Sequence, residues 1–444
     1  MVNAAELFRD ARDEPVRIAL VGAGQFGATL AGQAPRLPGV GIAAVCDVDG
    51  EKAARLAPEG AAVLTDALEV AGVDADVVVE ATGHPETAAA LAEACIAAGK
   101  HVVMATKEAE VAVGPMLARL AAEAGVVYTL ADGDQPSLLV GLVARARLLG
   151  LEVVVAGKSG EHDLVWTPDE GRLTHLTGDR PDYPAADFGA LWQGDRETVR
   201  RRTAAVPGAP LRTPSDLTEM AVVANHTGLG FEAPDLLAPI ARWPELPDLF
   251  RPHEAGGLLR RTGVVDMVTC LRRPDEASLA GGVFVVVRCD HAETWAVLAG
   301  KGIPVSGCGG YAALVNPVHL LGLEAMASIL QAVRLGLPTG AAAPEPRVDL
   351  AARATRHLGP GHDLAMGGHH HEIDGVEPLL VEAGPIGDDQ PLPFTMAANT
   401  RLAAAVAPGT LLTADMVEQP ADSALWRLRR RQDALFRTAA GSTS

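Results

Sequence analysis

Three glycines near the start of the chain have the spacing of a phosphate-binding loop. Gly22, Gly24 and Gly27 form a GxGxxG motif directly after the apolar run VRIALV, and a helix-compatible segment follows. The first glycine allows a tight turn, the second lets the backbone approach a pyrophosphate, and the third permits close packing of helix on strand. The helix N-terminus would then face the phosphates, with Gln25 and Phe26 in its first turn. This arrangement predicts a dinucleotide-binding site.

An acidic residue stands at the expected distance from these glycines. A second apolar run, GIAAVCD, ends at Asp47, twenty residues after Gly27. In dinucleotide-binding folds a carboxylate at this position accepts hydrogen bonds from the adenosine ribose. It favours NAD because it repels a 2′-phosphate, whereas Lys52 and Arg55 on the following helix could reach that phosphate. The residues therefore leave both NADH and NADPH open as the cofactor.

Lys107 is the candidate for the reaction itself. It ends the run GKHVVMATK, which we predict as the fifth strand, at the edge where open parallel sheets bind their ligands. An ammonium there can polarise a carbonyl oxygen while hydride reaches carbon, or exchange the alcohol proton in the reverse direction. A surface lysine that caps the strand is the alternative. The end of the preceding strand, DVVVEATG, adds Thr82, Gly83 and His84 as predicted cofactor contacts.

Two polar positions further along the chain are also candidate catalytic residues. Lys158 ends the run LEVVVAGK between small residues, so its ammonium has room to meet a phosphate or carboxylate of a ligand; a solvated loop lysine is the alternative. Asn225 lies in a helical stretch over 216–230, where it and His226 interrupt apolar residues. Such interruptions mark either a site or a helix cap.

No spacing pattern specifies a metal site. Asp132, Asp134 and Glu161 are the acids nearest the expected cleft, so they are the first candidates if the reaction needs a divalent cation. The histidine run 369–371 stands in a glycine loop, and consecutive residues cannot all converge on one ion. A divalent metal is compatible with the sequence but is not indicated by it.

The elements that position these residues alternate between strands and helices. Apolar strand-like runs are separated by helical patterns over residues 1–150, which predicts an α/β dinucleotide-binding domain built on a Rossmann-type doubly wound parallel sheet. Residues 151–340 change to strand-like runs with a long apolar helix over 319–336. We predict a mixed α+β substrate domain there, partly antiparallel, whose last helix packs back on the first domain.

The C-terminal part follows a Pro/Ala linker over 338–346. Residues 354–364 and 403–412 both place a hydrophobic run before a Pro-Gly turn and a leucine after it. Two such hairpin-like units suggest a small pseudo-symmetric β module over 341–444.

Composition limits the function classes. The chain has 444 residues with 37 Lys and Arg against 56 Asp and Glu, a net charge of −19, which argues against a nucleic-acid partner. No apolar stretch approaches the ~20 residues of a membrane span, and the N-terminus MVNAAELFRDARDEP is charged. Five cysteines without a CxxC pair indicate a reducing compartment. We predict a cytoplasmic homo-oligomer with a small-molecule substrate, in which the basic run over 424–437 is a solvated face or subunit contact.

The motifs GAGQFG, VVEATG, GKHVVMATKE, DGDQPSLL, AGKSG, ANHTGL, GGVFVVV and NPVHLLGLE occur in this order over nearly the whole chain. Together they resemble homoserine-dehydrogenase-like oxidoreductases that carry a C-terminal SAF (β-clip) domain. The best-known activity there is the second type of deoxyxylulose 5-phosphate reductoisomerase, which reduces and rearranges a sugar phosphate with NADPH. The resemblance implies that Lys107 matches a proton-relaying catalytic lysine. His226 departs from it, because a small residue is usual between Asn225 and Thr227.

These observations predict an NAD(P)-dependent oxidoreductase that transfers hydride to or from a small polar carbonyl or hydroxyl compound, with a sugar phosphate as one candidate. A reductoisomerase and a homoserine-dehydrogenase-like enzyme are alternatives within the same chemistry. A non-catalytic nucleotide-binding scaffold, or a lyase that uses Lys158 as a Schiff base, would belong to other classes.

Overall fold

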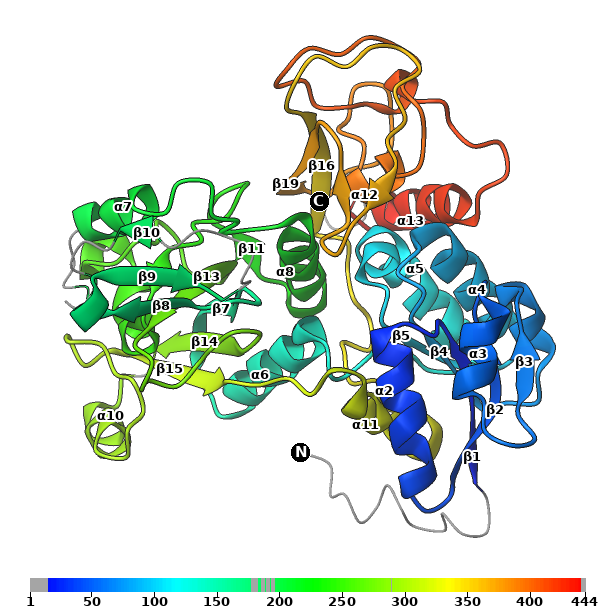
Figure 1. Ribbon diagram of the computed structural model, residues 1–444, viewed down its shortest axis with the longest axis horizontal. Coiled ribbons are helices and arrows are strands. Elements are labelled where there is room, and N and C mark those ends of the chain that lie inside the picture. Colours follow the sequence, from blue (N-terminus) through cyan, green and yellow to red (C-terminus); the bar gives the residue numbers. More distant parts are fainter. Residues whose placement is uncertain are drawn as a thin grey trace. The chain divides into compact units, whose positions relative to one another are not determined.

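The computed structural model describes residues 15–176, 183–184, 188, 192, 196–288 and 290–440, so the charged N-terminal segment and Cys289 lie outside the described residues. The chain forms two compact units (Figure 1). The first combines the residues up to Ser137 with those from Leu320 onward, and the second contains Leu138–His319. The α/β class with a Rossmann-type sheet is confirmed.

The first unit is built on a six-stranded parallel sheet with the order β3-β2-β1-β4-β5-β6. Val21 at the end of β1 pairs with Cys46 of β2 and with Glu80 of β4, and Glu80 pairs with Met104 of β5. The carboxyl ends of these four strands are therefore level, and the loops that follow them emerge at one edge. The strands are β1 (Val16–Val21), β2 (Val40–Cys46), β3 (Ala62–Leu64), β4 (Val77–Glu80), β5 (His101–Met104) and β6 (Tyr128–Leu130).

Helices cover both sides of this sheet, as the blue to cyan ribbon in Figure 1 shows. The helix predicted over 319–336 is not continuous: it consists of a 3₁₀ turn, a short α-helix and a π-helical turn. Its apolar residues nevertheless pack with Ile18, Leu20 and Leu30 in the core, which confirms that this segment returns to the first domain. The helices are α2 (Gln25–Gln33), α3 (Gly50–Leu56), α4 (Pro85–Ala97), α5 (Lys107–Ala124) and α11 (Ala325–Leu330), with 3₁₀ turns Ala34–Arg36, Ala67–Gly72 and Leu321–Leu323 and the π-turn Gln331–Leu335. Helix α6 (Gln135–Leu148) begins in this unit, and its residues from Leu138 onward belong to the second unit.

A small antiparallel sheet with the order β16-β19-β18-β17 follows in the same unit. The two predicted hairpin-like segments meet each other, because the backbone N–H groups of Leu358 and Val406 donate reciprocally at 3.1 and 3.0 Å. The assignment of this part to the SAF class stays a prediction. Its elements are β16 (Val348–Ala354), β17 (Met366–Gly367), β18 (Glu372–Ile373), β19 (Val376–Glu382), α12 (Phe394–Ala397), the 3₁₀ turn Ala414–Met416 and α13 (Ala424–Ala440).

The basic run of α13 is used inside the unit. Arg429 is almost fully buried and donates to Asp349 at 2.6 Å and to Asp433 at 2.8 Å. Arg427 and Arg431 both pair with Glu93 of α4. The predicted solvated face is therefore wrong for the buried Arg429, whereas Arg427 and Arg431 remain exposed while they pair with Glu93.

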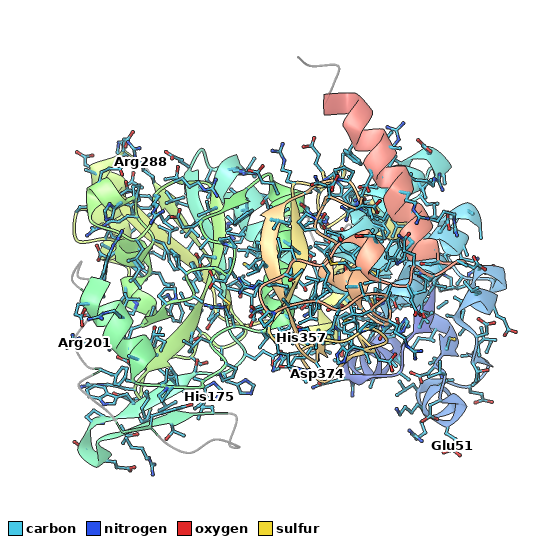
Figure 2. The ribbon with its side chains drawn as sticks, turned by 90° about the horizontal axis from the view of Figure 1, so that it is seen from above. Glu51, His175, Arg201, Arg288, His357 and Asp374 are labelled. Atoms are coloured by element: carbon cyan, nitrogen blue, oxygen red, sulfur yellow. The ribbon has the colours of Figure 1, made fainter. Side chains whose placement is uncertain are left out.

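The second unit holds a mixed nine-stranded sheet in which β13 is parallel to β7 and β14 is antiparallel to β7. The predicted partly antiparallel arrangement is confirmed. Charged side chains such as Arg201 and Arg288 lie at its surface (Figure 2). The elements are β7 (Glu152–Ser159), β8 (Leu164–Thr167), β9 (Arg172–His175), β10 (Tyr183–Pro184), β11 (Gly230–Phe231), β12 (Ile240–Ala241), β13 (Val264–Arg272), β14 (Val283–Arg288), β15 (Tyr311–Asn316), α7 (Arg196–Ala204), α8 (Pro214–Thr227), α9 (Leu246–Leu249) and α10 (Ala292–Ala299), with 3₁₀ turns Pro168–Glu170, Trp243–Glu245 and His253–Ala255.

Candidate dinucleotide and catalytic site

A cavity of about 490 Å³ opens at the carboxyl ends of β1, β2 and β4. This is the edge of a parallel sheet where the strand order reverses, and open α/β sheets bind their ligands there. Five of the predicted cofactor residues line the cavity: Gly22, Gly24, Asp47, Thr82 and His84. Lys52 also lines it, together with Val48 and Thr65. The structure therefore places these five predicted residues around one cavity, and their role in cofactor binding stays a prediction.

Glycine is favoured at the three positions of the loop for different physical reasons. Gly22 has φ +104, and a Cβ there would collide with the carbonyl oxygen of Ala81. A Cβ on Gly27 would collide with the carbonyl oxygen of Gly22, so helix α2 could not approach the loop. A Cβ on Gly24 would meet nothing within 4 Å. Gly22 and Gly27 are required for the backbone, whereas Gly24 keeps open the space in front of the helix N-terminus.

Gln25 and Phe26 form the first turn of α2 and are not among the residues that line the cavity. The ring of Phe26 packs against the apolar core of the first unit. A contact of Phe26 with a cofactor would therefore come from its backbone N–H, which the helix leaves without an intrahelical partner.

Asp47 is held in place by the backbone. One carboxylate oxygen accepts from the N–H of Ala23 in the glycine loop at 2.7 Å, and the other accepts from the N–H of Asp49 at 2.9 Å. These bonds orient the carboxylate along the cavity wall and tie the end of β2 to the glycine loop. Each oxygen keeps a second lone pair with which it can accept from a ligand hydroxyl.

The loop after β4 is joined to the start of α5. The backbone N–H of Gly83 donates to the hydroxyl of Thr106 at 2.9 Å. Glu80, fully buried at the end of β4, accepts from the backbone N–H of Thr82 at 2.9 Å and from its hydroxyl at 2.5 Å. Burial raises the pKa of Glu80, and its hydrogen bonds to Thr82 and Thr106 oppose this rise. The result is a fixed loop that carries Thr82 and His84 into the cavity.

Lys107 is the first residue of α5, directly after Thr106, and its side chain is half-buried. The predicted strand over 99–107 is shorter: β5 ends at Met104, so Lys107 begins the helix and does not end the strand. The correction keeps Lys107 at the ligand edge of the sheet, and the Gly83–Thr106 bond places its backbone beside the cofactor loop.

Lys158 belongs to the second unit, and the environment of its side chain differs from the prediction. It lies within β7, its side chain is 1% exposed, and its ammonium pairs with Asp216 at 2.7 Å and with Glu219. Both acids lie on the first turns of α8, and the other Asp216 oxygen accepts from the N–H of Thr213 at 2.8 Å to cap that helix. The expectation of an ammonium with room for a ligand is corrected, because carboxylates of the chain itself surround it.

Asn225 lies near the C-terminal end of the same helix, α8, and is 5% exposed. The predicted helical region over 216–230 is confirmed, although α8 ends at Thr227 and Gly228 follows in the left-handed conformation. A catalytic role for Asn225 stays a prediction.

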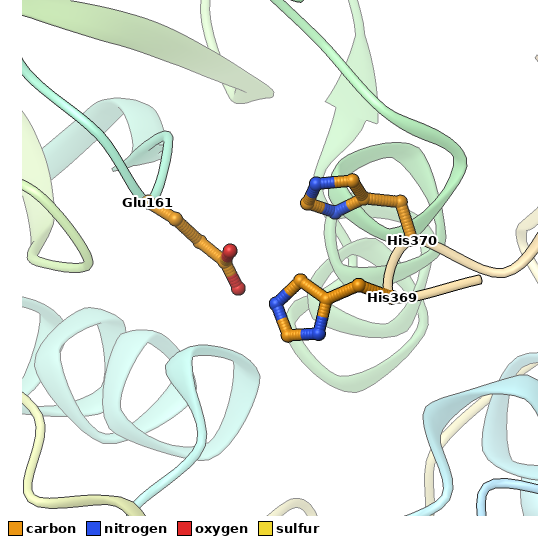
Figure 3. Close-up of side chains that lie close together, drawn as sticks. All are labelled: Glu161, His369 and His370. Atoms are coloured by element: carbon orange, nitrogen blue, oxygen red, sulfur yellow. The ribbon is translucent and has the colours of Figure 1, made fainter. Parts of the chain in front are cut away.

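Two of the three acids named as candidates for a divalent cation, Asp132 and Asp134, lie in the first unit. Burial raises the pKa of Asp132 to about 6, and its carboxylate accepts from Ser137. Asp134 accepts from the N–H of Gln135 at the start of α6. Within the described residues, neither acid belongs to a group of three potential metal ligands. Figure 3 shows His369 and His370 with ring centroids 4.9 Å apart, and Glu161, drawn with them, is a residue of the second unit.

Sequence reasoning missed His371. Its Nδ1 lies 2.5 Å from an oxygen of Glu108, the residue that follows Lys107 in α5. The two residues are 263 positions apart, and no spacing rule connects them. The only sequence signal was a run of histidines inside a glycine loop. Such a run does not indicate that His371 contacts Glu108 or that it lies near the edge of the parallel sheet.

Two family models match the chain. Residues 21–131 match the NAD-binding domain of homoserine dehydrogenase, and residues 213–325 match the catalytic domain of the oxidoreductase DRL. Both matches are to domains of oxidoreductases, so the resemblance to homoserine-dehydrogenase-like oxidoreductases is confirmed. Neither match covers the C-terminal part of the chain. No curated protein is similar enough in sequence to match.

Solved structures resemble parts of the chain. An NAD-binding oxidoreductase from Klebsiella pneumoniae is 26% identical over 34% of this chain and 46% of its own, with a TM-score of 0.27. GenD2 from gentamicin A biosynthesis, solved with NAD, is 18% identical over 73% of this chain and 88% of its own, with a TM-score of 0.38. A DOX-P reductoisomerase solved with fosmidomycin and magnesium is 20% identical over 33% and 46%, with a TM-score of 0.27. The chain spans about half the length of the first and third of these proteins.

The described residues include no helix that is both long and apolar enough to cross a membrane.

Proposed function

We propose that this chain is an NAD(P)-dependent oxidoreductase that transfers hydride to or from a small polar carbonyl or hydroxyl compound. The observation that carries the proposal is the cavity at the carboxyl edge of the parallel sheet, which the glycine loop and Asp47 line on one side and Thr82 and His84 on the other. The bond from Gly83 to Thr106 joins this cavity wall to Lys107.

The residues of the cavity fit a dinucleotide. The space in front of Gly24 lies at the N-terminus of α2, where backbone N–H groups and the helix dipole favour a pyrophosphate. Asp47 retains lone pairs for a ribose hydroxyl, and Lys52 lies in the same wall. When bound, the nicotinamide supplies or accepts the hydride.

Lys107 holds the proton that accompanies the hydride. In the direction of reduction its Nζ donates to the oxygen of the substrate carbonyl, and in the direction of oxidation it accepts the alcohol proton. Lys107 is half-buried and is the first residue of α5. The substrate that we propose is a hydroxylated acid or sugar phosphate, and the protein acts as a cytoplasmic homo-oligomer without a nucleic-acid partner.

A reductoisomerase of the deoxyxylulose 5-phosphate type is the second candidate. The match of residues 213–325 to the DRL catalytic domain favours it. Such an enzyme breaks and forms a carbon–carbon bond besides transferring hydride, so the carbon skeleton of the product distinguishes the two functions. Product NMR after turnover of a phosphorylated ketose would show a rearranged skeleton only for the reductoisomerase.

The cofactor site is tested with Gly24→Val. A Cβ at this position meets no atom within 4 Å, and the valine side chain enters the space proposed for the pyrophosphate, so folding should be retained and the affinity for NADH and NADPH should fall by about a hundredfold or more. Isothermal titration calorimetry measures the affinity. Gly32→Val is the matched control, because Gly32 lies on α2, has nothing within 4 Å of its Cβ position, and does not line the cavity. Unchanged binding in Gly24→Val would refute the site.

A further inference from the structure

The C-terminal part of the chain reaches the loop that carries the cofactor residues. His371, between β17 and β18, places Nδ1 at 2.5 Å from an oxygen of Glu108. The side chain of Glu108 is 3% exposed and that of His371 is 26% exposed. His371 has φ +54, an uncommon backbone conformation for a residue with a side chain. This arrangement holds the imidazole in one position against the first turn of α5.

The hydrogen bond to Glu108 fixes which edge of the imidazole is available. An ionised carboxylate only accepts, so the Nδ1–H of His371 donates to Glu108, and in the neutral form of the ring Nε2 is an acceptor. Among the described residues, Nε2 makes no hydrogen bond of its own. The ring therefore offers an oriented acceptor to a group that the chain does not supply.

The free edge of the ring faces the cofactor loop. A Cβ built on Gly83 would lie 3.7 Å from both Cε1 and Nε2 of His371, so this edge is in van der Waals range of the loop. Gly83 stands between Thr82 and His84, which both line the cavity. The same loop is fixed to Thr106 by its backbone N–H. His371 is thus next to both the β4 loop and the residue that follows Lys107.

This position corresponds to one half of a dinucleotide. A dinucleotide would bind where the strand order reverses, between β1 and β4. Asp47, at the end of β2, would then hold the adenosine ribose, and the loops after β4 and β5 would lie toward the nicotinamide. His371 approaches these two loops.

The C-terminal part has further attachments to α4 and α5. Gln432 of α13 bonds to Met116 and Ala112 of α5, each at 3.1 Å. Glu86 of α4 accepts from the N–H of Ala424 at 2.7 Å, at the start of α13. Because of these contacts, removal of the His371 ring would not release this part of the chain, and the effect of a substitution there reports on the site.

We propose that His371 is a positioning residue for the nicotinamide half of the bound dinucleotide, so that the C-terminal part completes the oxidoreductase site. Its Nε2 accepts from a hydroxyl or amide N–H of that half, while Glu108 orients the ring. The inference rests on the proposed function, since it assumes that the cavity binds a dinucleotide.

The test compares a ligand that contains the nicotinamide half with one that lacks it. His371→Asn is the sharpest variant, because asparagine tolerates the left-handed backbone, can donate to Glu108 from the position of Nδ1, and removes the Nε2 edge. We expect the dissociation constant for NADH, or for NADPH if the wild type prefers it, to rise about tenfold. The dissociation constant for ADP, or for 2′-phospho-ADP in the second case, stays within about twofold.

Four further variants complete the experiment. His357→Asn is the matched control, because His357 is an exposed histidine of the same part of the chain (Figure 2) and should change neither constant. Glu108→Ala frees the ring of His371 and should repeat the loss for the whole cofactor, with no additional loss in the double variant. If the melting temperature of His371→Asn falls, His371→Gly, which adopts positive φ without strain, must give the same selective loss.

The outcomes separate the two proposals. A loss for the whole cofactor with ADP unchanged supports the role of His371. Two results would overturn that role and leave the proposed function standing. One is an equal loss of affinity for the whole cofactor and for ADP in His371→Asn. The other is no loss of affinity in His371→Asn while Gly24→Val weakens the binding of both ligands. If Gly24→Val itself changes neither constant, the cofactor site is wrong and the inference fails with it.

Discussion

Lys107 and Lys158 occupy two different environments in the two units. Lys107 begins α5 at the open edge of the parallel sheet, beside a cavity wall, and is half-buried. Lys158 lies inside β7, is 1% exposed, and has Asp216 and Glu219 around its ammonium. Carboxylates of the chain enclose the ammonium of Lys158, which predicts a role in stability. The catalytic role proposed for Lys107 depends instead on its place at the ligand edge of the sheet.

Lys158→Met should give the largest effect, and it should be on stability. Loss of the ammonium leaves Asp216 and Glu219 buried without their countercharge, and breaking a buried ion pair from one side costs about 3–5 kcal/mol. Urea unfolding at constant pH measures the change in the free energy of unfolding. A normal stability together with lost turnover would reverse the comparison and make Lys158 a catalytic residue.

The matched control for Lys158→Met neutralises the whole cluster. Asp216→Asn and Glu219→Gln added to Lys158→Met remove the two unpaired charges, and the amide oxygen of the new asparagine would still accept from the N–H of Thr213 at the helix cap. The triple variant should therefore recover part of the lost stability. If it is less stable than Lys158→Met alone, unpaired carboxylates are not the cause of the loss.

Lys107→Ala should affect turnover and leave the fold intact. Removal of one positioned proton donor lowers kcat by about a hundredfold or more, while the glycine loop and Asp47 continue to bind the dinucleotide. Hydride transfer is followed by the absorbance of NAD(P)H, and cofactor binding by calorimetry. Lys301→Ala, at an exposed lysine of the second unit, is the control. A Lys107→Ala enzyme within a few-fold of wild type would remove Lys107 from the mechanism.

The sequence predicted those features that depend on neighbouring residues. The three glycines, Asp47 and the alternation of strands and helices are local signals, and the structure places Gly22, Gly24 and Asp47 around one cavity. The end of β5 was misplaced by three residues because MATK continues an apolar run, whereas the helix begins as soon as Thr106 provides an extended N-cap. Strand and helix ends are set by hydrogen bonds that apolar patterns do not show.

The features that the sequence did not reveal depend on pairs distant in the chain. Lys158 is buried because Asp216 and Glu219, about sixty residues later, supply its countercharges. His371 meets Glu108 because the C-terminal part folds back on α5 and α4. A single sequence does not show which distant residues pair. The sequence around a lysine or histidine flanked by small residues is therefore the same whether its side chain faces solvent, a ligand or a buried acid.

Asp47→Ser should have the smallest effect, a change in cofactor preference with little change in stability. The carboxylate of Asp47 is fixed on the cavity wall by Ala23 and Asp49, where it repels a 2′-phosphate, and Lys52 lines the same cavity. Serine removes the charge and can still accept one backbone N–H, so the ratio of kcat/KM for NADPH to that for NADH should rise about tenfold. Asp49→Ser is the matched control: it removes the same charge and can still cap α3, but Asp49 does not line the cavity. If both variants shift the ratio equally, the negative charge near the end of β2, and not a contact at Asp47, sets the cofactor preference. If neither variant shifts the ratio, Asp47 does not face the ribose, and its carboxylate serves only to hold the glycine loop.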